Sequence, residues 1–212
     1  MKSKGFSGFI YRLTELIMKF AYLQLLWIAF TIVGLGIFGI FPSTAAMFSV
    51  VRKWVMGVED TPVFKTFWQT YKTEFVKVNG LGLIFVVIGW ILYVDFHFFT
   101  IGESLVSSIV KIVIILIAYF FITTCIYFFP IFVHFKYRFF DYIKYSFLYS
   151  VVSPLKTAGV FIISYLIYFL LMKVPALILF FGGSVISYIW MWYVYNTIVK
   201  LNKLSKDKNA KK

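Results

Sequence analysis

The longest stretch without a charged residue runs from Phe20 to Val51, and this apolar run constrains the fold more than any other feature of the sequence. Four further runs are free of charge apart from Lys111, and they cover 81–93, 106–133, 158–172 and 174–199. The hydrophobic fraction is 62% and the charged fraction 14%, against roughly 45–50% and about 25% in ordinary soluble domains. So few charged residues are not enough to cover the surface of a water-soluble protein. We therefore expect an all-α, polytopic membrane helix bundle.

A helix that crosses a bilayer core needs about 20 apolar residues, so the length of each run can be tested. The last four runs each fit one span, whereas the first has 32 residues and contains Gly34, Gly36, Gly39 and Pro42 near its middle. It therefore predicts either two short spans or one span followed by a surface helix. The preferred arrangement is one membrane domain over 1–212 with six spans, at about 17–34, 38–57, 79–98, 105–133, 156–173 and 175–199.

The placement of lysine and arginine favours six spans over five, because positive residues in short loops stay in the cytoplasm. Six spans put 19 basic residues on the cytoplasmic side and two on the outer side, whereas five spans put 15 on the cytoplasmic side and six on the outer side. Both termini are then cytoplasmic, and 200–212 forms a basic cytoplasmic tail. The first apolar run is too long for the core of a cleavable signal peptide, so we expect it to be retained.

Two segments between spans read as cytoplasmic amphipathic helices, at 61–78 and 137–150. The first starts with Thr61 and Pro62, a favourable N-cap and first helical residue. Its aromatic residues recur at helical spacing, and they are Phe64, Phe67, Trp68, Tyr71 and Phe75. Such a face suits either the headgroup region of the membrane or a docking partner, and the sequence leaves both interpretations open.

Asp95 and Lys111 are charged residues inside or beside apolar spans, where a charge is costly and needs a reason to remain. If the outer turn lies near Gly102, the two occur at similar depth on adjacent antiparallel helices. The sequence thus predicts an ion pair between them. The pair either fixes the register of the hairpin or contacts a substrate, an ion or a partner.

No catalytic motif occurs: the chain has no phosphate-binding loop, no nucleophile elbow and no H-E-x-x-H pattern. One cysteine excludes an intrachain disulfide, and two histidines leave little for a metal site. We expect no enzymatic activity, no cofactor and no metal. The net charge of +13 lies mostly beside spans, where an anionic leaflet explains it without nucleic acid.

The stretch from Leu25 to Phe75 carries a family resemblance, LLWIAFTIVGLGIFGIFPSTAAMFSVVRKWVMGVEDTPVFKTFWQTYKTEF. It combines a first span with leucine and tryptophan, a glycine and proline turn, a small-residue STAA run, a basic pair and an aromatic amphipathic helix. In this order of features it resembles the YesL-like family of small multi-pass bacterial membrane proteins. Lysine outnumbers arginine 18 to 3, which is typical of a low-G+C Gram-positive source.

The resemblance implies a protein of the bacterial cytoplasmic membrane whose relatives accompany oligosaccharide uptake by binding-cassette importers. We therefore expect a non-enzymatic accessory or assembly subunit that contacts the lipid bilayer and the permease subunits of such an importer. The alternative is a small transporter or channel in its own right. The sequence leaves the sugar, the partners and the oligomeric state open.

Overall fold

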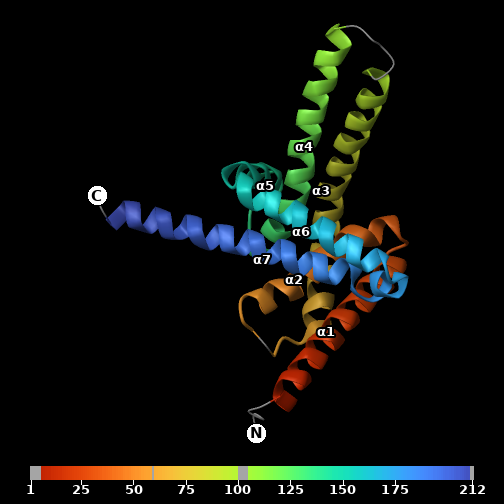
Figure 1. The fold of residues 1–212 in the computed structure, drawn as a ribbon, viewed down its shortest axis with the longest axis vertical. Helices are drawn as coiled ribbons and strands as arrows, with labels where there is room; N and C mark the ends of the chain where they lie inside the picture. Colours follow the sequence, from red (N-terminus) through yellow and green to blue (C-terminus); the bar gives the residue numbers. More distant parts are fainter. Residues whose placement is uncertain (1–5, 59, 100–104, 211–212) are drawn as a thin grey trace.

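The computed structural model describes residues 6–58, 60–99 and 105–210, over which the chain forms seven helices (Figure 1). In chain order they are α1 (Phe6–Val33), α2 (Ile37–Val55), α3 (Val63–Phe99), α4 (Leu105–His134), α5 (Asp141–Val152), α6 (Pro154–Met172) and α7 (Pro175–Ala210). The predicted all-α membrane bundle is confirmed. The predicted outer turn near Gly102 and the chain ends at 1–5 and 211–212 lie outside the described residues.

The long first run breaks into α1 and α2 at a tight glycine turn. Leu35 and Gly36 have φ values of 59° and 72°, in the left-handed region that favours glycine. The two helices then approach closely, because Gly34 and Gly39 face each other's backbones without side chains. A Cβ on Gly34 would also lie 2.7 Å from the Tyr71 hydroxyl of α3. The turn is thus packed from three helices at once.

Pro42 does not end α2 but lies inside it, and α3 compensates for the hydrogen bond that proline removes. A proline at this position cannot donate to the carbonyl four residues earlier, which is that of Phe38. Asn79 fills the gap, since its Nδ2 donates to Phe38 O at 3.0 Å and to Phe75 O of its own helix at 3.0 Å. In a bilayer an unsatisfied carbonyl is costly, so this contact ties α3 to α2.

The first half of α3 runs antiparallel to α2 along its length. Thr66 Oγ1 accepts from Lys53 Nζ at 2.9 Å near one end of the pair, and Asn79 bonds Phe38 at the other. Gly82 permits the close approach there, because a Cβ would lie 2.6 Å from ring carbons of Phe41. The predicted cytoplasmic helix 61–78 and the predicted second span 38–57 therefore lie side by side at one level.

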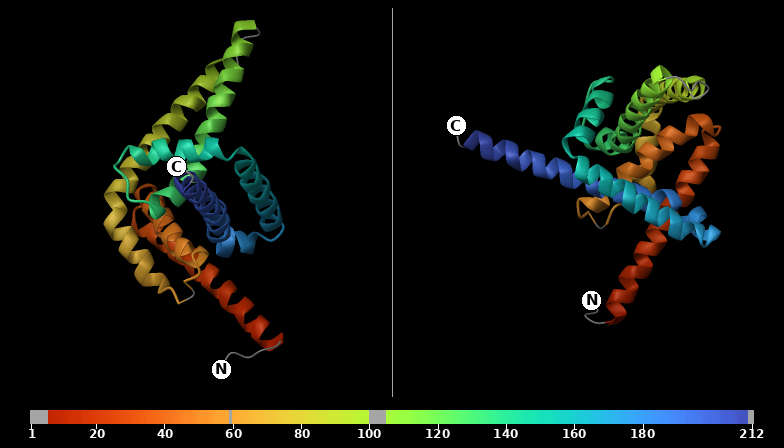
Figure 2. Two further views of the ribbon diagram at one scale, coloured as in Figure 1. Left: turned by 90° about the vertical axis from the view of Figure 1, so that its left-hand side faces the viewer. Right: turned by 45° about the horizontal axis from the view of Figure 1, so that its top comes forward.

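The second half of α3 and the first half of α4 project beyond the other helices as an antiparallel hairpin (Figures 1 and 2). Below it, α4 enters the core, where the rings of Phe85 and Phe128 lie 4.8 Å apart. Two buried apolar clusters make up the core: one has most of its residues on α3, α4 and α7 with single residues from α2, α5 and α6, and the other lies on α1, α2 and α3 with Met191 of α7. The stacked rings of Phe48 and Phe129, 5.5 Å apart, connect them.

The last three helices form a bent unit. The axes of α5 and α6 meet at 94° beside Pro154, and α6 then lies antiparallel to α7, where Trp190 Nε1 donates to Ser164 Oγ at 2.9 Å. Beyond the other helices α7 continues through Ala210, so the predicted tail after residue 199 is helical over its described part (Figure 1).

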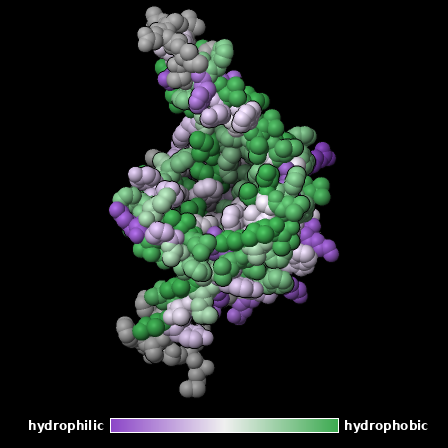
Figure 3. All heavy atoms as spheres, turned by 90° about the vertical axis from the view of Figure 1, so that its right-hand side faces the viewer, coloured by the Kyte–Doolittle hydropathy of each residue, from purple (hydrophilic) through white to green (hydrophobic). Residues whose placement is uncertain are grey.

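Length and composition make four helices candidate spans, or five if α5 and α6 are one broken span. The preferred count of six is not confirmed. The predicted cytoplasmic helix 61–78 and the predicted span 79–98 are parts of one continuous helix, and Asn79, Gly80 and Gly82 at their junction pack against neighbouring elements. The membrane boundary between the two parts stays a prediction. The predicted helix 137–150 begins later, at Asp141. Hydrophobic side chains cover most of the face seen in Figure 3, as a lipid-embedded protein requires.

A test of the Pro42 compensation is a double-mutant cycle. We expect Asn79→Leu to lower the free energy of unfolding by about 1–3 kcal/mol, because the Phe38 carbonyl loses its donor. In a Pro42→Ala background a backbone N–H replaces that donor, so Asn79→Leu should cost clearly less. Thermal unfolding in detergent measures both costs. The control is Asn196→Leu, the same substitution at a half-buried position on α7, whose cost should not depend on Pro42. Equal costs of Asn79→Leu in the Pro42 and Pro42→Ala backgrounds would contradict the compensation.

Candidate functional site

Asp95 and Lys111 lie on the facing helices of the projecting hairpin, and both are half-buried. Within the described residues no ion pair of 4.0 Å or less joins them. The Lys111 ammonium instead lies 5.9 Å from the ring centre of Phe96, next to Asp95. The structure thus places the two residues on neighbouring helices without pairing them, and the ion pair stays a prediction.

The aromatic face predicted for 61–78 is split between the core and the surface. Phe67 is fully buried and Tyr71 is 6% exposed, whereas Phe64 and Trp68 are 50% and 44% exposed. Phe75 is half-buried, with its ring 5.5 Å from that of Tyr71.

The ring of Phe30 on α1 lies against this whole face, since its centre is 5.2 Å from that of Phe67, 5.0 Å from Tyr71 and 5.5 Å from Trp68. Tyr71 also donates its hydroxyl to Phe30 O at 3.1 Å. These two α3 residues hold α1 in place. Of the five predicted interface residues, Phe64 and Trp68 are therefore the ones most open to another molecule.

A basic and aromatic site that the sequence did not predict lies where α2, α4 and α7 meet. Arg52 Nε, in the last turn of α2, donates to His134 Nδ1 at the end of α4 at 3.2 Å. An accepting Nδ1 places the proton of the neutral imidazole on Nε2. The ring of Tyr195 on α7 lies 5.8 Å from the His134 ring, and Tyr195 interacts electrostatically with Arg52. Three helices thus build one site.

Lys77 forms a second basic site against the corner between α4 and α5. Its Nζ donates to Tyr142 Oη at 3.2 Å and to Tyr137 O at 3.5 Å, and it lies 4.5 Å from the Tyr142 ring centre. Tyr142 in turn accepts from the Tyr137 N–H and donates to Phe135 O. Burial, with the neighbouring Tyr149, raises the pKa of Tyr137, so its hydroxyl stays protonated at neutral pH. The corner is rigid and positively charged.

Polar side chains deeper in the bundle serve helix contacts. Gln24 on α1 accepts through Oε1 from the backbone N–H groups of Gly183 and Ser184 on α7, at 3.0 and 2.9 Å. Gly183 permits this approach, since a Cβ would lie 3.0 Å from that oxygen. Ser187 Oγ lies 3.1 Å from Met47 Sδ nearby. Such interhelical bonds are worth about 0.6–2 kcal/mol each.

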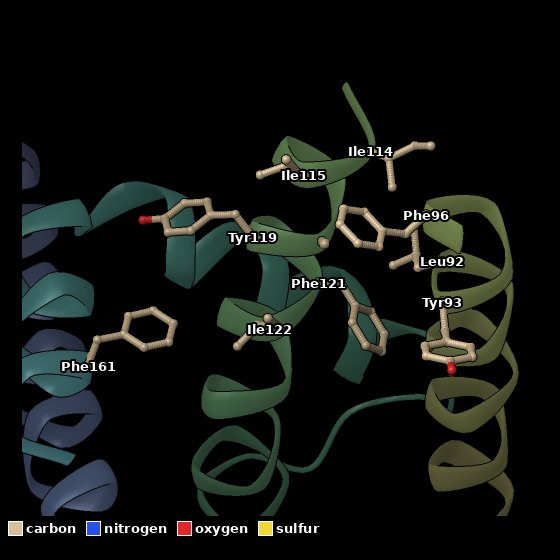
Figure 4. A pocket seen from close by; sticks show the side chains of 11 residues that line it. Leu92, Tyr93, Phe96, Ile114, Ile115, Tyr119, Phe121, Ile122 and Phe161 are labelled. Atoms are coloured by element: carbon tan, nitrogen blue, oxygen red, sulfur yellow. The ribbon is translucent and has the colours of Figure 1, made fainter. Parts of the chain in front are cut away.

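An apolar groove of about 530 Å³ lies around the outer part of α4 (Figure 4). Residues of α3, α4 and α6 line it, among them Leu92, Phe96, Ile114, Tyr119, Phe121 and Phe161. Its lining suits a lipid chain or an apolar helix. Among the described residues no three of His, Cys, Asp or Glu group together as a metal site, and Cys125 is a free thiol.

Comparison with known proteins identifies the family. A family described as "Protein of unknown function, DUF624" matches residues 20–96. The chain is 40% identical to the uncharacterized protein YteU of Bacillus subtilis (strain 168) over 203 residues, which are 96% of this chain and 91% of YteU. The chain belongs to this family.

Two other members from the same organism cover most of the chain. The uncharacterized protein YesV is 36% identical over 184 residues, which are 87% of this chain and 88% of YesV. The uncharacterized protein YesL is 35% identical over 177 residues, which are 82% of this chain and 81% of YesL. The predicted YesL-like resemblance is thereby confirmed. No solved structure matches the chain.

The split aromatic face of α3 gives a second prediction. Phe67→Ala should lower the free energy of unfolding by about 3–5 kcal/mol, because it leaves a cavity under Phe30. Trp68→Ala, at a half-exposed position on the same helix, should cost clearly less. Thermal unfolding of the two variants in one detergent compares them, and a Trp68→Ala loss as large as that of Phe67→Ala would contradict the assignment.

Proposed function

We propose that the chain is a non-enzymatic accessory or assembly subunit of a bacterial binding-cassette importer for oligosaccharides. The YesL-like resemblance suggests the uptake role. The projecting hairpin is the structural observation that supports a subunit role.

The hairpin exposes large apolar side chains that no other helix of the described chain covers. Leu83 and Trp90 on α3 are 62% and 67% exposed, and Ile112 on α4 is 68% exposed. Their surface projects away from the rest of the bundle (Figures 1 and 2). A rigid apolar hairpin at membrane depth can pack against the spans of a permease, because van der Waals contact drives helix association in lipid.

The alternative, a transporter or channel in its own right, needs a polar path through the bundle. Several buried polar groups instead bond other helices, as Gln24 does with α7 and as Tyr127 does with Thr157 at 3.1 Å. The groove beside α4 has an almost wholly apolar lining. These features favour docking over transport.

We also propose that the protein lies in the bacterial cytoplasmic membrane with both termini in the cytoplasm. The charge split of 19 to two supports this orientation. The structure adds that Lys156, at the start of α6, lies near Lys200 on α7. A cytoplasmic location lets both lysines face the anionic inner leaflet.

Cysteine accessibility tests the orientation. In a Cys125→Ser background we expect Tyr11→Cys, at a 71% exposed position, and Lys203→Cys, also exposed, to resist an impermeant thiol reagent in intact cells. Both should react after the membrane is permeabilised. Reaction of Tyr11→Cys alone in intact cells would establish the five-span arrangement and place the N-terminus outside.

Site-specific photo-crosslinking tests the subunit role. A crosslinker at Trp90, on the hairpin, should capture a permease subunit of a sugar importer in native membranes. The same group at Tyr165 on α6, which is 69% exposed, is the matched control. Equal capture of the permease subunit from Trp90 and Tyr165 would show that the hairpin is not the docking surface. Sugar uptake by the purified chain alone in proteoliposomes would replace the subunit role with transport.

A further inference from the structure

Arg52 is a half-buried cation without an acidic partner. No carboxylate of the described residues lies within 4.0 Å of its guanidinium, and its hydrogen-bond acceptor is an imidazole nitrogen. Arginine that is partly removed from water normally pairs with a carboxylate or phosphate, which matches its planar fork of donors. The described part of the chain therefore supplies no anionic partner for this fork of N–H donors.

His134 holds the guanidinium by its Nε, which leaves the two terminal nitrogens and their four N–H donors available. Because the hydrogen bond to His134 is made by Nε and not by a terminal nitrogen, it orients the plane of the guanidinium and leaves its terminal nitrogens free to form the fork of donors. The Tyr195 ring lies 5.8 Å from the His134 ring, and its hydroxyl makes no hydrogen bond within the described chain. This hydroxyl adds one more donor to the same cluster of side chains. Arg52 of α2 and Tyr195 of α7 thus offer up to five hydrogens to an acceptor with several oxygens, and His134 of α4 contacts both residues.

The surroundings of the fork indicate a membrane ligand. Met56 and Val58, which follow Arg52 on the chain, are 44% and 48% exposed and apolar. Lys53, the next residue, adds a second positive charge and bonds Thr66. A cation at the end of an apolar helix, beside exposed apolar residues, lies where phospholipid headgroups begin.

We propose that Arg52 and Tyr195, held by His134, bind the phosphate of an anionic phospholipid. The two terminal nitrogens of Arg52 donate to two phosphate oxygens side by side, and the tyrosine hydroxyl donates to the same group. The apolar residues after Arg52 contact the lipid chains. This site is independent of the importer role, because it needs no second protein.

Native mass spectrometry of the purified chain in detergent, titrated with phosphatidylglycerol or phosphatidylcholine, tests the site. The wild-type chain should bind phosphatidylglycerol more tightly than phosphatidylcholine. Arg52→Gln should weaken phosphatidylglycerol binding about tenfold more than Arg138→Gln does, because hydrogen bonds to a charged group are stronger than diffuse attraction. Arg138 is the matched control, since it is exposed and lies in the corner before α5. Tyr195→Phe should also weaken binding, by a few fold.

Two further measurements keep the outcome clear. If Arg52→Gln does not fold, Arg52→Lys retains the charge but not the fork, and it should still weaken phosphatidylglycerol binding relative to wild type. Equal losses in Arg52→Gln and Arg138→Gln would overturn the site in favour of diffuse charge. Inorganic phosphate that stabilises the lipid-free wild type but not Arg52→Gln would assign the same chemistry to a soluble ligand and overturn the lipid assignment.

Discussion

The need to satisfy backbone polar groups in lipid ties the first three helices together, and the rest of the bundle is assembled on them. Pro42 leaves the Phe38 carbonyl inside α2 without its backbone donor, and Asn79 of α3 donates a hydrogen bond to that carbonyl instead. About two turns away on α3, Tyr71 donates to Phe30 O of α1, where Gly34 leaves room for its hydroxyl. The α1–α2 turn, with φ values that suit glycine, makes the close approach possible. Together these contacts fix α2 as the buried centre of the molecule.

A buried α2 determines what its two ends present. Its beginning lies beside the middle of α3, from which the second half of α3 continues into the hairpin without a break in the helix. Its last turn carries Arg52 to the ends of α4 and α7, where His134 and Tyr195 meet it. The packing that stabilises the fold therefore also builds the basic site. The matched family segment 20–96 contains the turn, the Pro42–Asn79 compensation and Arg52 alike.

Sequence patterns predicted the helices better than the packing contacts between them. Hydropathy indicated the membrane bundle, and the glycines after Val33 indicated a break that the structure places at 34–36. The sequence did not show that 61–78 and 79–98 form one continuous helix, because a polar residue and two glycines look the same whether they end a helix or pack it against a neighbour. The site residues show the same limit. Helical spacing identified an aromatic face on α3, but it cannot tell that the fold buries Phe67 fully and leaves Trp68 half-exposed. Nor does any local pattern join Arg52 to His134, which is 82 positions away.

The length of α3 has a consequence for how the bundle can lie in a membrane. As one helix of 37 residues it is about 55 Å long along its axis, well beyond the thickness of a bilayer core of about 30 Å. The helix curves near its middle (Figure 2), so its first half packs against α2 while its second half is directed into the hairpin. The two halves of this one helix therefore meet the membrane at different angles, and the length of the helix does not have to fit a single straight crossing.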